Sequence, residues 1–426
     1  MRHDSFVIRA DICYSASPQS LRLYPGGWLV CLEGRSAGVF QALPEQYASL
    51  PVLDCGRSLV VPGLTDLHVH APQYASRGQG MDLELLDWLD RYTFPEESKY
   101  ASLDYAGQAY QRFVEDVRRG PNTRACVFAT IHPEATIRLM DLLEESGLCA
   151  MVGKVNMDRS CPEALREPSA AASVESTKAW LEGIEGRYSR TRPILTPRFI
   201  PSCTDALMEE LGRLQRQYGL PVQSHLSESL SEIAWVRELC PAARNYGDAY
   251  RAFGLLGGPG CPTVMAHCVY SDGEEAALLK EQNVLIAHCP ASNTNLSSGI
   301  APVRRFLRDG LRVGLGSDVA GGTHTSIFRA MADAIQVSKL RWRLVDQSLA
   351  PLTVSEAFYL GTLGGGAFFG KVGSFAPGYE FDALVIGDNR YTPQEEMDLE
   401  TRLERTVYLS DERDIQHKFV QGRRLF

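Results

Sequence analysis

The sequence predicts an α/β protein, a (β/α)8 barrel joined to a small β domain that is made from both ends of the chain. Three observations lead to this prediction. Short apolar runs alternate with amphipathic segments through the middle of the chain, several runs end on polar side chains, and both termini consist of strand-like runs and turns. Repeated alternation of strands and helices is typical of a parallel sheet.

The middle of the chain contains the candidate barrel strands. Amphipathic stretches such as 205–217 and 272–281 separate them, as expected for helices that cover a sheet. Eight such runs favour a closed barrel. A doubly wound sheet is the alternative, but the G-x-G-x-x-G turn that often begins one follows no early run here. The runs are Gly63–His68, Ala125–Ala129, Ala150–Val155, Pro193–Pro197, Pro221–His225, Pro262–His267, Val284–His288 and Leu311–Leu315.

The two ends of the chain resemble each other and differ from the middle. Residues 5–61 contain short apolar runs separated by turn signals such as Pro25-Gly26-Gly27, and the same pattern returns after about Lys371. We therefore expect residues 1–60 and 376–426 to form a small β-sandwich domain. Residues 61–375 are expected to form the catalytic barrel between them.

Composition excludes several classes of partner. The 426 residues carry a formal net charge of -9, which argues against nucleic acid and against an anionic membrane surface. No apolar run reaches the roughly 18 residues that a spanning helix needs. The eleven cysteines form no C-x-x-C pair and no signal peptide precedes them, so we expect free thiols in the cytoplasm.

Polar residues at the ends of the predicted strands indicate a metal site. His68 and His70 are two positions apart, so in a strand both imidazoles face the same side. The fifth run ends on His225, the sixth on His267, and Asp318 follows the eighth. In a barrel the C-terminal ends of the strands converge on one face. Histidines with a carboxylate form a suitable zinc set that leaves room for water.

One carboxylate and two further histidines also lie near the predicted strand ends. Glu228 lies three residues beyond His225, where a carboxylate could reach a water molecule at the metal. His288 is expected to be structural or to lie outside the ligand shell. His132 could approach the pocket, and a structural role is the alternative.

The segment Val61-Pro62-Gly63-Leu64-Thr65-Asp66-Leu67-His68-Val69-His70 resembles the first-strand signature of the amidohydrolase superfamily. The following motifs resemble its guanine deaminase branch, and the resemblance covers about residues 60–386. These motifs are His70-Ala71-Pro72-Gln73-Tyr74, Tyr92-Thr93-Phe94-Pro95-Glu96-Glu97, Phe128-Ala129-Thr130-Ile131-His132, Thr196-Pro197-Arg198-Phe199, Gln223-Ser224-His225 with Ser227-Glu228, and Asp318-Val319-Ala320-Gly321-Gly322.

The resemblance implies a role for each site residue. It implies an amidohydrolase-type barrel with one zinc per subunit, iron being the alternative metal, and a homodimer. In binuclear relatives a lysine at the end of the fourth strand often bridges the metals; here Arg198 stands there and Lys154 belongs to the third run, so Lys154 is read as structural. The implied metal ligands are His68, His70, His225 and Asp318; the implied catalytic residues are Glu228, His267 and Asp318; and the implied substrate-binding residues are Gln73, Arg198, Phe199, Glu228 and Asp318.

The implied reaction is the hydrolytic deamination of guanine, a small purine base, to xanthine and ammonia in purine catabolism or salvage. The nearest alternative is a zinc-dependent deaminase of another aminated ring, such as a pterin, an oxidised purine or a triazine. A catalytically dead barrel that serves as a binding module is disfavoured, because every implied ligand is present. A cytidine-type zinc deaminase would need H-x-E with P-C-x-x-C, and the sequence has neither.

Overall fold

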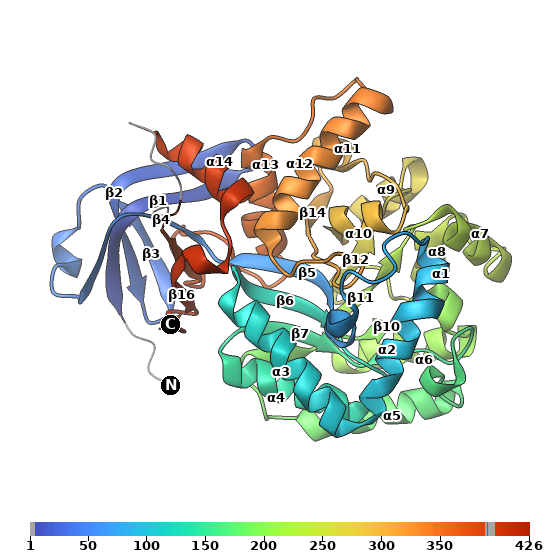
Figure 1. Ribbon diagram of the computed structural model, residues 1–426. Helices are drawn as coiled ribbons and strands as arrows, with labels where there is room; N and C mark the ends of the chain where they lie inside the picture. The colour runs from blue at the N-terminus through green and yellow to red at the C-terminus, as the bar shows by residue number, and fades with distance from the viewer. Residues whose placement is uncertain (1–4, 388–389, 391–396) are drawn as a thin grey trace.

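The computed structural model describes residues 5–387, 390 and 397–426. Within them, a barrel ringed by helices lies on the right of Figure 1, and a smaller sheet built from both ends of the chain lies on the left. The arrangement of the strands therefore has the two parts that the sequence pattern predicts.

The barrel strands form two parallel four-stranded sheets. The first sheet has the order β5 (Leu64–His70), β6 (Asn122–Phe128), β7 (Cys149–Gly153) and β9 (Thr191–Pro193). The second has the order β11 (Val222–Leu226), β12 (Thr263–His267), β13 (Leu285–His288) and β14 (Arg312–Leu315).

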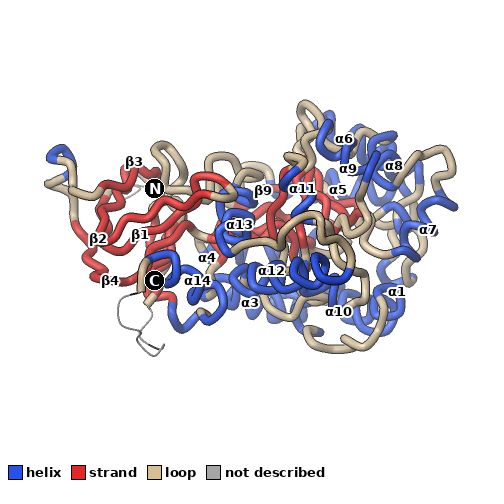
Figure 2. The backbone as a smooth tube through the Cα atoms, turned by 90° about the horizontal axis from the view of Figure 1, so that it is seen from above, coloured by secondary structure: helices blue, strands red, loops and turns tan. Residues whose placement is uncertain are grey.

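Hydrogen bonds join the two sheets at both seams. A parallel bridge links Leu195, just beyond β9, to Val222 of β11. At the other seam the amide of Asp318 donates to the carbonyl of His68, with an N···O distance of 2.8 Å. Figure 2 shows the barrel strands at the centre with helices around them.

The barrel interior is filled with apolar side chains, as expected for a packed core. These side chains form one buried cluster, so the lower part of the barrel is closed to solvent and chemistry is confined to the C-terminal mouth. The cluster consists of Leu67, Cys126, Met151, Ile194, Val264, Leu285 and Ala287.

The outer helices bury one apolar face against the strands. In α6 (Asp205–Tyr218), the Thr204 hydroxyl accepts from the Leu207 amide at the start, and Gly219 ends the helix in the left-handed region at φ 63°. The other helices are α3 (Leu103–Arg119), α4 (Pro133–Ser146), α5 (Ala170–Ile184), α7 (Leu230–Leu239), α8 (Tyr246–Ala252), α9 (Gly273–Glu281), α10 (Pro290–Asn295), α11 (Val303–Arg308), α12 (Ile327–Leu344) and α13 (Val354–Tyr359).

The fourth predicted strand, 193–197, is not one continuous strand. It is divided into β9, which pairs with β7, and β10 (Thr196–Pro197), which pairs with β8 (Val155–Asn156). Between them the hydrogen-bond partner changes, because the Ile194 amide donates to Val152 and the Leu195 amide donates to Pro221. The break redirects the chain so that Arg198 follows β10 at the mouth of the barrel.

The strands of both chain ends form one mixed sheet, with α14 (Leu399–Leu409) beside it. Side chains from its distant strands share a single buried cluster that includes Ile8, Leu29, Val60, Val385 and Phe419. The strands that we expected to form a small β-sandwich are thus hydrogen-bonded into one continuous sheet. Its strand order is β17 (Arg423–Arg424), β16 (Ile415–Val420), β15 (Ala383–Ile386), β4 (Val52–Pro62), β1 (Phe6–Ser17), β2 (Ser20–Leu32) and β3 (Arg35–Phe40).

A buried ion pair connects the barrel to this sheet. The Arg124 guanidinium, on β6, lies 2.6 Å from a carboxylate oxygen of Asp382 and 2.6 Å from one of Glu380. We expect Arg124→Met to lower the free energy of unfolding by about 3–5 kcal/mol, because the Asp382 carboxylate would stay buried without its cation. Urea denaturation measures this loss.

The exposed pair between Arg9 and Asp54 is the matched control for that measurement. Both side chains are about half exposed, so Arg9→Met should cost about 1 kcal/mol or less. Equal losses in the two variants would show that the Arg124 pair does not tie the barrel to the sheet.

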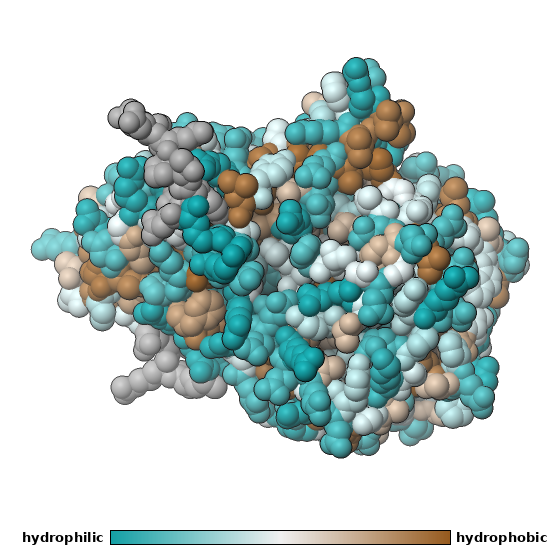
Figure 3. All heavy atoms as spheres, viewed as in Figure 1, coloured by the Kyte–Doolittle hydropathy of each residue, from teal (hydrophilic) through white to brown (hydrophobic). Residues whose placement is uncertain are grey.

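The visible surface is largely hydrophilic with scattered apolar patches, one of them on a projecting tip (Figure 3). This tip is the end of α12, where Leu340, Leu344 and Val345 are exposed. Among the described residues, no helix has the length and apolar character that crossing a membrane requires.

Candidate metal and substrate site

The site begins with two histidines at the C-terminal end of β5. His68 and His70 face the same side of the strand, and their Nε2 atoms lie 3.2 Å apart. His225, on β11, brings its Nε2 to 3.2 Å from that of His70. Asp318, just after β14, places Oδ1 3.1 Å from His68 Nε2 and 3.5 Å from His70 Nε2. The fold therefore brings all four predicted ligands together.

The spacing of these four atoms fits a single metal ion. Tetrahedral ligands with bonds of about 2.1 Å lie about 3.4 Å from one another. Four of the six distances between these atoms run from 3.1 to 3.5 Å. Three imidazole nitrogens with one carboxylate oxygen are donors that zinc accepts. The residues present thus fit a mononuclear centre.

The protonation states also suit metal binding. Burial lowers the pKa of His68, and it holds the pKa values of His70 and His225 well below the usual value for histidine. Burial alone would raise the pKa of Asp318, but the nearby His68 outweighs it and holds that pKa far below the usual range. Neutral imidazoles and an ionised carboxylate are the forms that ligate a metal.

Hydrogen bonds at the outer ring nitrogens orient two of the imidazoles. His225 donates from Nδ1 to the carbonyl oxygen of Arg198 at 2.6 Å, which leaves Nε2 free to ligate. His267 makes the corresponding contact from Nδ1 to Asn293 Oδ1 at 2.9 Å. Its buried Nε2 has no hydrogen-bond partner within the described part of the chain. It lies 3.7 Å from Asp318 Oδ2, so it faces the centre from beside the four ligands.

Glu228 lies next to this group and is not one of the four ligands. Its Oε2 is 3.5 Å from His267 Nε2, and the hydroxyl of Ser298 donates to its Oε1 at 3.3 Å. Burial, followed by the charge of Asp318, raises the pKa of Glu228 well above the usual value. A carboxyl group that gains a proton this readily is suited to carry one.

The backbone beside the site is strained. Ser227, His267, Cys268 and Asp318 adopt φ angles between 46° and 74°, in the left-handed region that non-glycine residues rarely occupy. Such conformations cluster at functional sites, where the surrounding structure holds side chains in place. Two of these positions, His267 and Asp318, are predicted site residues, and the other two each adjoin one, Glu228 or His267.

A cavity opens on the metal cluster. Part of its apolar wall comes from a segment between β5 and α3, in which Leu85 and Trp88 lie on α1 (Leu85–Trp88) and Leu89 follows. The cavity thus combines an apolar wall with a polar end and a metal-binding end. It is lined by His70, Gln73, Leu85, Trp88, Leu89, Arg198, Phe199, His225, Glu228, Glu232, His267, Leu296 and Asp318.

All five predicted substrate-binding residues line this cavity. Gln73 and Arg198 form its polar end, and Phe199, which is buried, packs edge-on against Trp235. Arg198 offers only hydrogen-bond donors, whereas a glutamine amide both donates and accepts. A flat ring with polar edge atoms fits this combination of side chains.

Sequence reasoning gave no role to three buried carboxylates near the site. Asp66 accepts from the Ser317 amide at 2.9 Å and ties β5 to the end of β14; burial raises its pKa to about 7. Glu232 accepts from the Glu228 amide at 3.0 Å, a position that its capping box with Ser229 signals. Glu97, on α2 (Phe94–Ser98), belongs to the Tyr92–Glu97 motif of the resemblance, which gave it no role.

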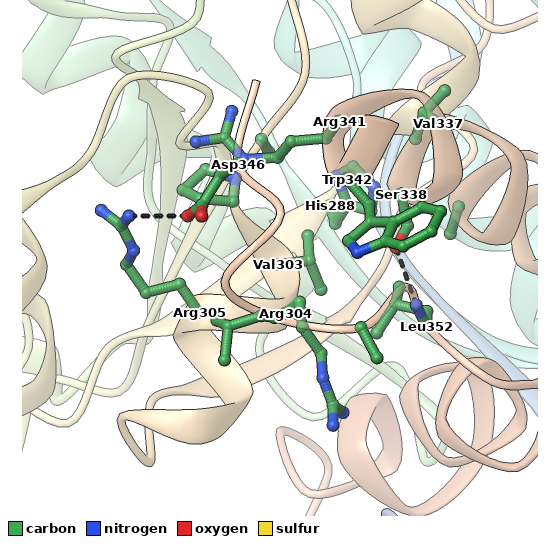
Figure 4. A pocket seen from close by; sticks show the side chains of 15 residues that line it. His288, Val303, Arg304, Arg305, Val337, Ser338, Arg341, Trp342, Asp346 and Leu352 are labelled. Carbon is green, nitrogen blue, oxygen red and sulfur yellow. Dashed lines mark hydrogen bonds and ion pairs between the residues drawn. The ribbon is translucent and has the colours of Figure 1, made fainter. Parts of the chain in front are cut away.

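Three other residues singled out from the sequence lie outside the cluster. Figure 4 shows His288 beside Trp342 in a different pocket, lined by residues of α11 and α12. His288 therefore belongs to the outer face of the barrel, in agreement with a structural role. Lys154 is fully buried and pairs with Glu167, which also agrees with its structural reading. His132 precedes α4 and is not among the described residues that line the site cavity.

Comparison with known proteins assigns the family. The model of the amidohydrolase family matches residues 59–425. Guanine deaminase of Dictyostelium discoideum is 40% identical over 382 residues, 88% of this chain and 84% of that protein. Guanine deaminase of Rattus norvegicus is 39% identical over 380 residues, 86% of this chain and 82% of that protein.

A solved structure agrees with these relatives and confirms the predicted fold class. The crystal structure of guanine deaminase from C. acetobutylicum, with guanine bound in its active site, matches with a TM-score of 0.96 and 44% identity, covering 99% of this chain and all of that one (100%). The chain therefore belongs to the amidohydrolase family, within the guanine deaminase branch of hydrolases that act on C–N bonds in cyclic amidines.

Proposed function

We propose that this protein is a zinc-dependent guanine deaminase, which converts guanine and water to xanthine and ammonia. The observation that carries the proposal is the cavity itself: a four-ligand metal cluster and a polar end made by Gln73 and Arg198 face the same pocket. The identity to guanine deaminases over most of the chain supports the choice of ring.

The substrate would bind with its polar edge against Gln73 and Arg198. Arg198 would donate to the O6 carbonyl of guanine, and Phe199 would lie against the ring. This orientation turns C2 and its exocyclic amine toward the metal end of the cavity. The apolar side chains of Leu85, Trp88 and Leu89 would exclude bulk water from the ring.

The chemical step uses residues at the metal end. Zinc held by His68, His70, His225 and Asp318 would lower the pKa of a water molecule to about 7 and make it a nucleophile at neutral pH. His267 would orient that water through its free Nε2. A C2–O bond would form, and the bond from C2 to the exocyclic amine nitrogen would break.

The two protons of the water molecule would follow separate routes. Glu228 would take the first and deliver it to the ring nitrogen beside C2. Asp318 would pass the second to the exocyclic amine, which leaves as ammonia. Glu228 suits the first transfer, because it lies close to His267 without being one of the four ligands.

The deciding experiment follows xanthine formation from guanine with purified protein, before and after chelation and again after zinc or iron is added back. We expect turnover that the chelator removes and zinc restores, with zinc as the better of the two metals. A panel of pterins, oxidised purines and triazines is assayed for ammonia release in parallel. Turnover of one of those rings with no reaction of guanine would overturn the choice of substrate and keep the hydrolase.

We further propose that the protein acts in purine catabolism or salvage in the cytoplasm, as a homodimer. The eleven cysteines, most of them buried, agree with a reducing compartment. The dimer rests on the family resemblance. Light scattering of the purified protein measures its mass directly, and a monomer would contradict this part of the proposal.

A further inference from the structure

A buried carboxylate links the two residues at the polar end of the cavity. Glu97 is only 2% exposed. Its Oε1 accepts from Gln73 Nε2 at 2.7 Å, and its Oε2 accepts from Arg198 Nη1 at 2.7 Å. Gln73 follows β5 and Arg198 follows β10, so Glu97 joins side chains that the barrel supplies from separate strands.

These contacts fix which end of the Gln73 amide is the donor. A glutamine amide can rotate and exchange its oxygen and nitrogen. Here the Gln73 oxygen accepts from the Ala320 amide at 3.1 Å, while the nitrogen donates to Glu97. A rotated amide would set its oxygen against the Glu97 carboxylate and its NH2 group against the Ala320 amide hydrogen, so both contacts would become repulsive.

The same carboxylate holds Arg198. One of its guanidinium nitrogens donates to Glu97, and its Cζ lies over the Phe94 ring, 5.1 Å from the ring centroid. The remaining N–H groups of Arg198 are donors only. With the Gln73 oxygen occupied by Ala320, the polar end of the cavity presents donors to a bound ring.

We propose that Glu97 is a positioning residue that makes this end of the cavity select rings with a carbonyl oxygen over rings with an amino group at the same position. An oxo group accepts from the donors of Gln73 and Arg198. An amino group would bring further donors against them, and unpaired buried donors are costly. The inference rests on the proposed guanine deaminase function, and it defines 2,6-diaminopurine as the informative competitor of guanine.

The neighbouring residue Glu96 provides a matched control. It lies on the same short helix and is also buried, at 7% exposed. Its carboxylate contacts Lys99 Nζ at 2.6 Å and the Tyr105 hydroxyl. Glu96→Gln therefore makes the same chemical change at a site with no contact to Gln73 or Arg198.

The test measures kcat and KM for guanine and for 2,6-diaminopurine in the wild type, E97Q and E96Q, with zinc content and Tm for each. A glutamine at position 97 offers one acceptor oxygen to two donors, so the Gln73 amide becomes free to rotate. We expect E97Q to lower kcat/KM for guanine by about 10- to 100-fold, chiefly through KM. The ratio of guanine to 2,6-diaminopurine should fall about tenfold, the scale of one discriminating hydrogen bond.

The outcomes separate this inference from the proposed function. A wild type that does not deaminate guanine overturns the proposed function, and this inference with it. An active wild type whose ratio is unchanged in E97Q, or changed equally in E96Q, overturns the role of Glu97 alone. Glu97→Asp retains the carboxylate and should keep more of the discrimination than E97Q. If E97Q does not fold, the guanine to 2,6-diaminopurine ratio of Glu97→Asp is compared with that of E96Q. Equal ratios in those two variants contradict the proposal.

Discussion

Replacing Glu228 by glutamine is expected to lower kcat by about 10²–10⁴-fold, the usual contribution of general acid–base catalysis. The glutamine has nearly the same shape, so it keeps the packing around this buried position. It cannot accept and release a proton near neutral pH, and the proposed transfer from water to the ring nitrogen fails. Steady-state kinetics with guanine measures the loss.

The same variant should retain its metal, because Glu228 is outside the four-ligand cluster. Zinc content near one per chain in E228Q would show that the loss is in proton transfer. Near-normal turnover would contradict the role of Glu228, and loss of zinc would place it among the ligands.

Ser298→Ala tests whether the hydrogen bond that orients the Glu228 carboxyl group contributes less to catalysis than proton transfer by that group. The Ser298 hydroxyl donates to Glu228 Oε1 at 3.3 Å, which is a long contact. Its removal should lower kcat by about tenfold or less, in keeping with the modest worth of one such hydrogen bond. A loss as large as that of E228Q would assign the effect to orientation of the carboxyl group.

The strand-end residues explain why so much of the site could be predicted from sequence. Each proposed ligand is marked locally: His68 and His70 by their spacing in a strand, His225 by closing an apolar run, and Asp318 by following one. Because parallel strands bring their C-terminal ends to one face, the order of elements alone predicts that these residues meet.

Glu97 shows where prediction from sequence ends. Its partner Arg198 lies 101 positions away, and neither the helical pattern around Glu97 nor its charge indicates burial. Asn293 is a similar case, since its contact with His267 depends on how α10 packs beside β12. Long-range pairs of this kind are set by tertiary packing, which local periodicity does not encode.

The sheet of the two termini was predicted in location but not in strand order. β4 pairs in parallel with β1 and antiparallel with β15, so the C-terminal strands attach to one side of the N-terminal ones. Alternating apolar residues mark a strand and its buried face. They do not specify its neighbours, which is why the order β15, β4, β1 emerged only from the structure.

Loss of one metal ligand is expected to have the largest effect of all. His225→Ala removes the imidazole whose Nε2 lies 3.2 Å from that of His70, and leaves a cluster with three protein ligands. We expect the zinc content to fall well below one per chain. Turnover should fall by at least about 10³-fold, because water without the ion keeps a pKa near 16 in place of about 7.

His288→Ala is the control, since this histidine is also buried at a strand end but lines the pocket between α11 and α12. The zinc content of His288→Ala should match that of the wild type. His267→Asn should also keep its zinc, while its activity falls. Elemental analysis after gel filtration gives the stoichiometry, and circular dichroism checks that each variant is folded. A folded His225→Ala protein with full zinc and full activity would exclude His225 from the ligand set, and zinc loss in His267→Asn would add His267 to it. If both hold as expected, the metal is bound by His68, His70, His225 and Asp318, and His267 acts on the water beside it.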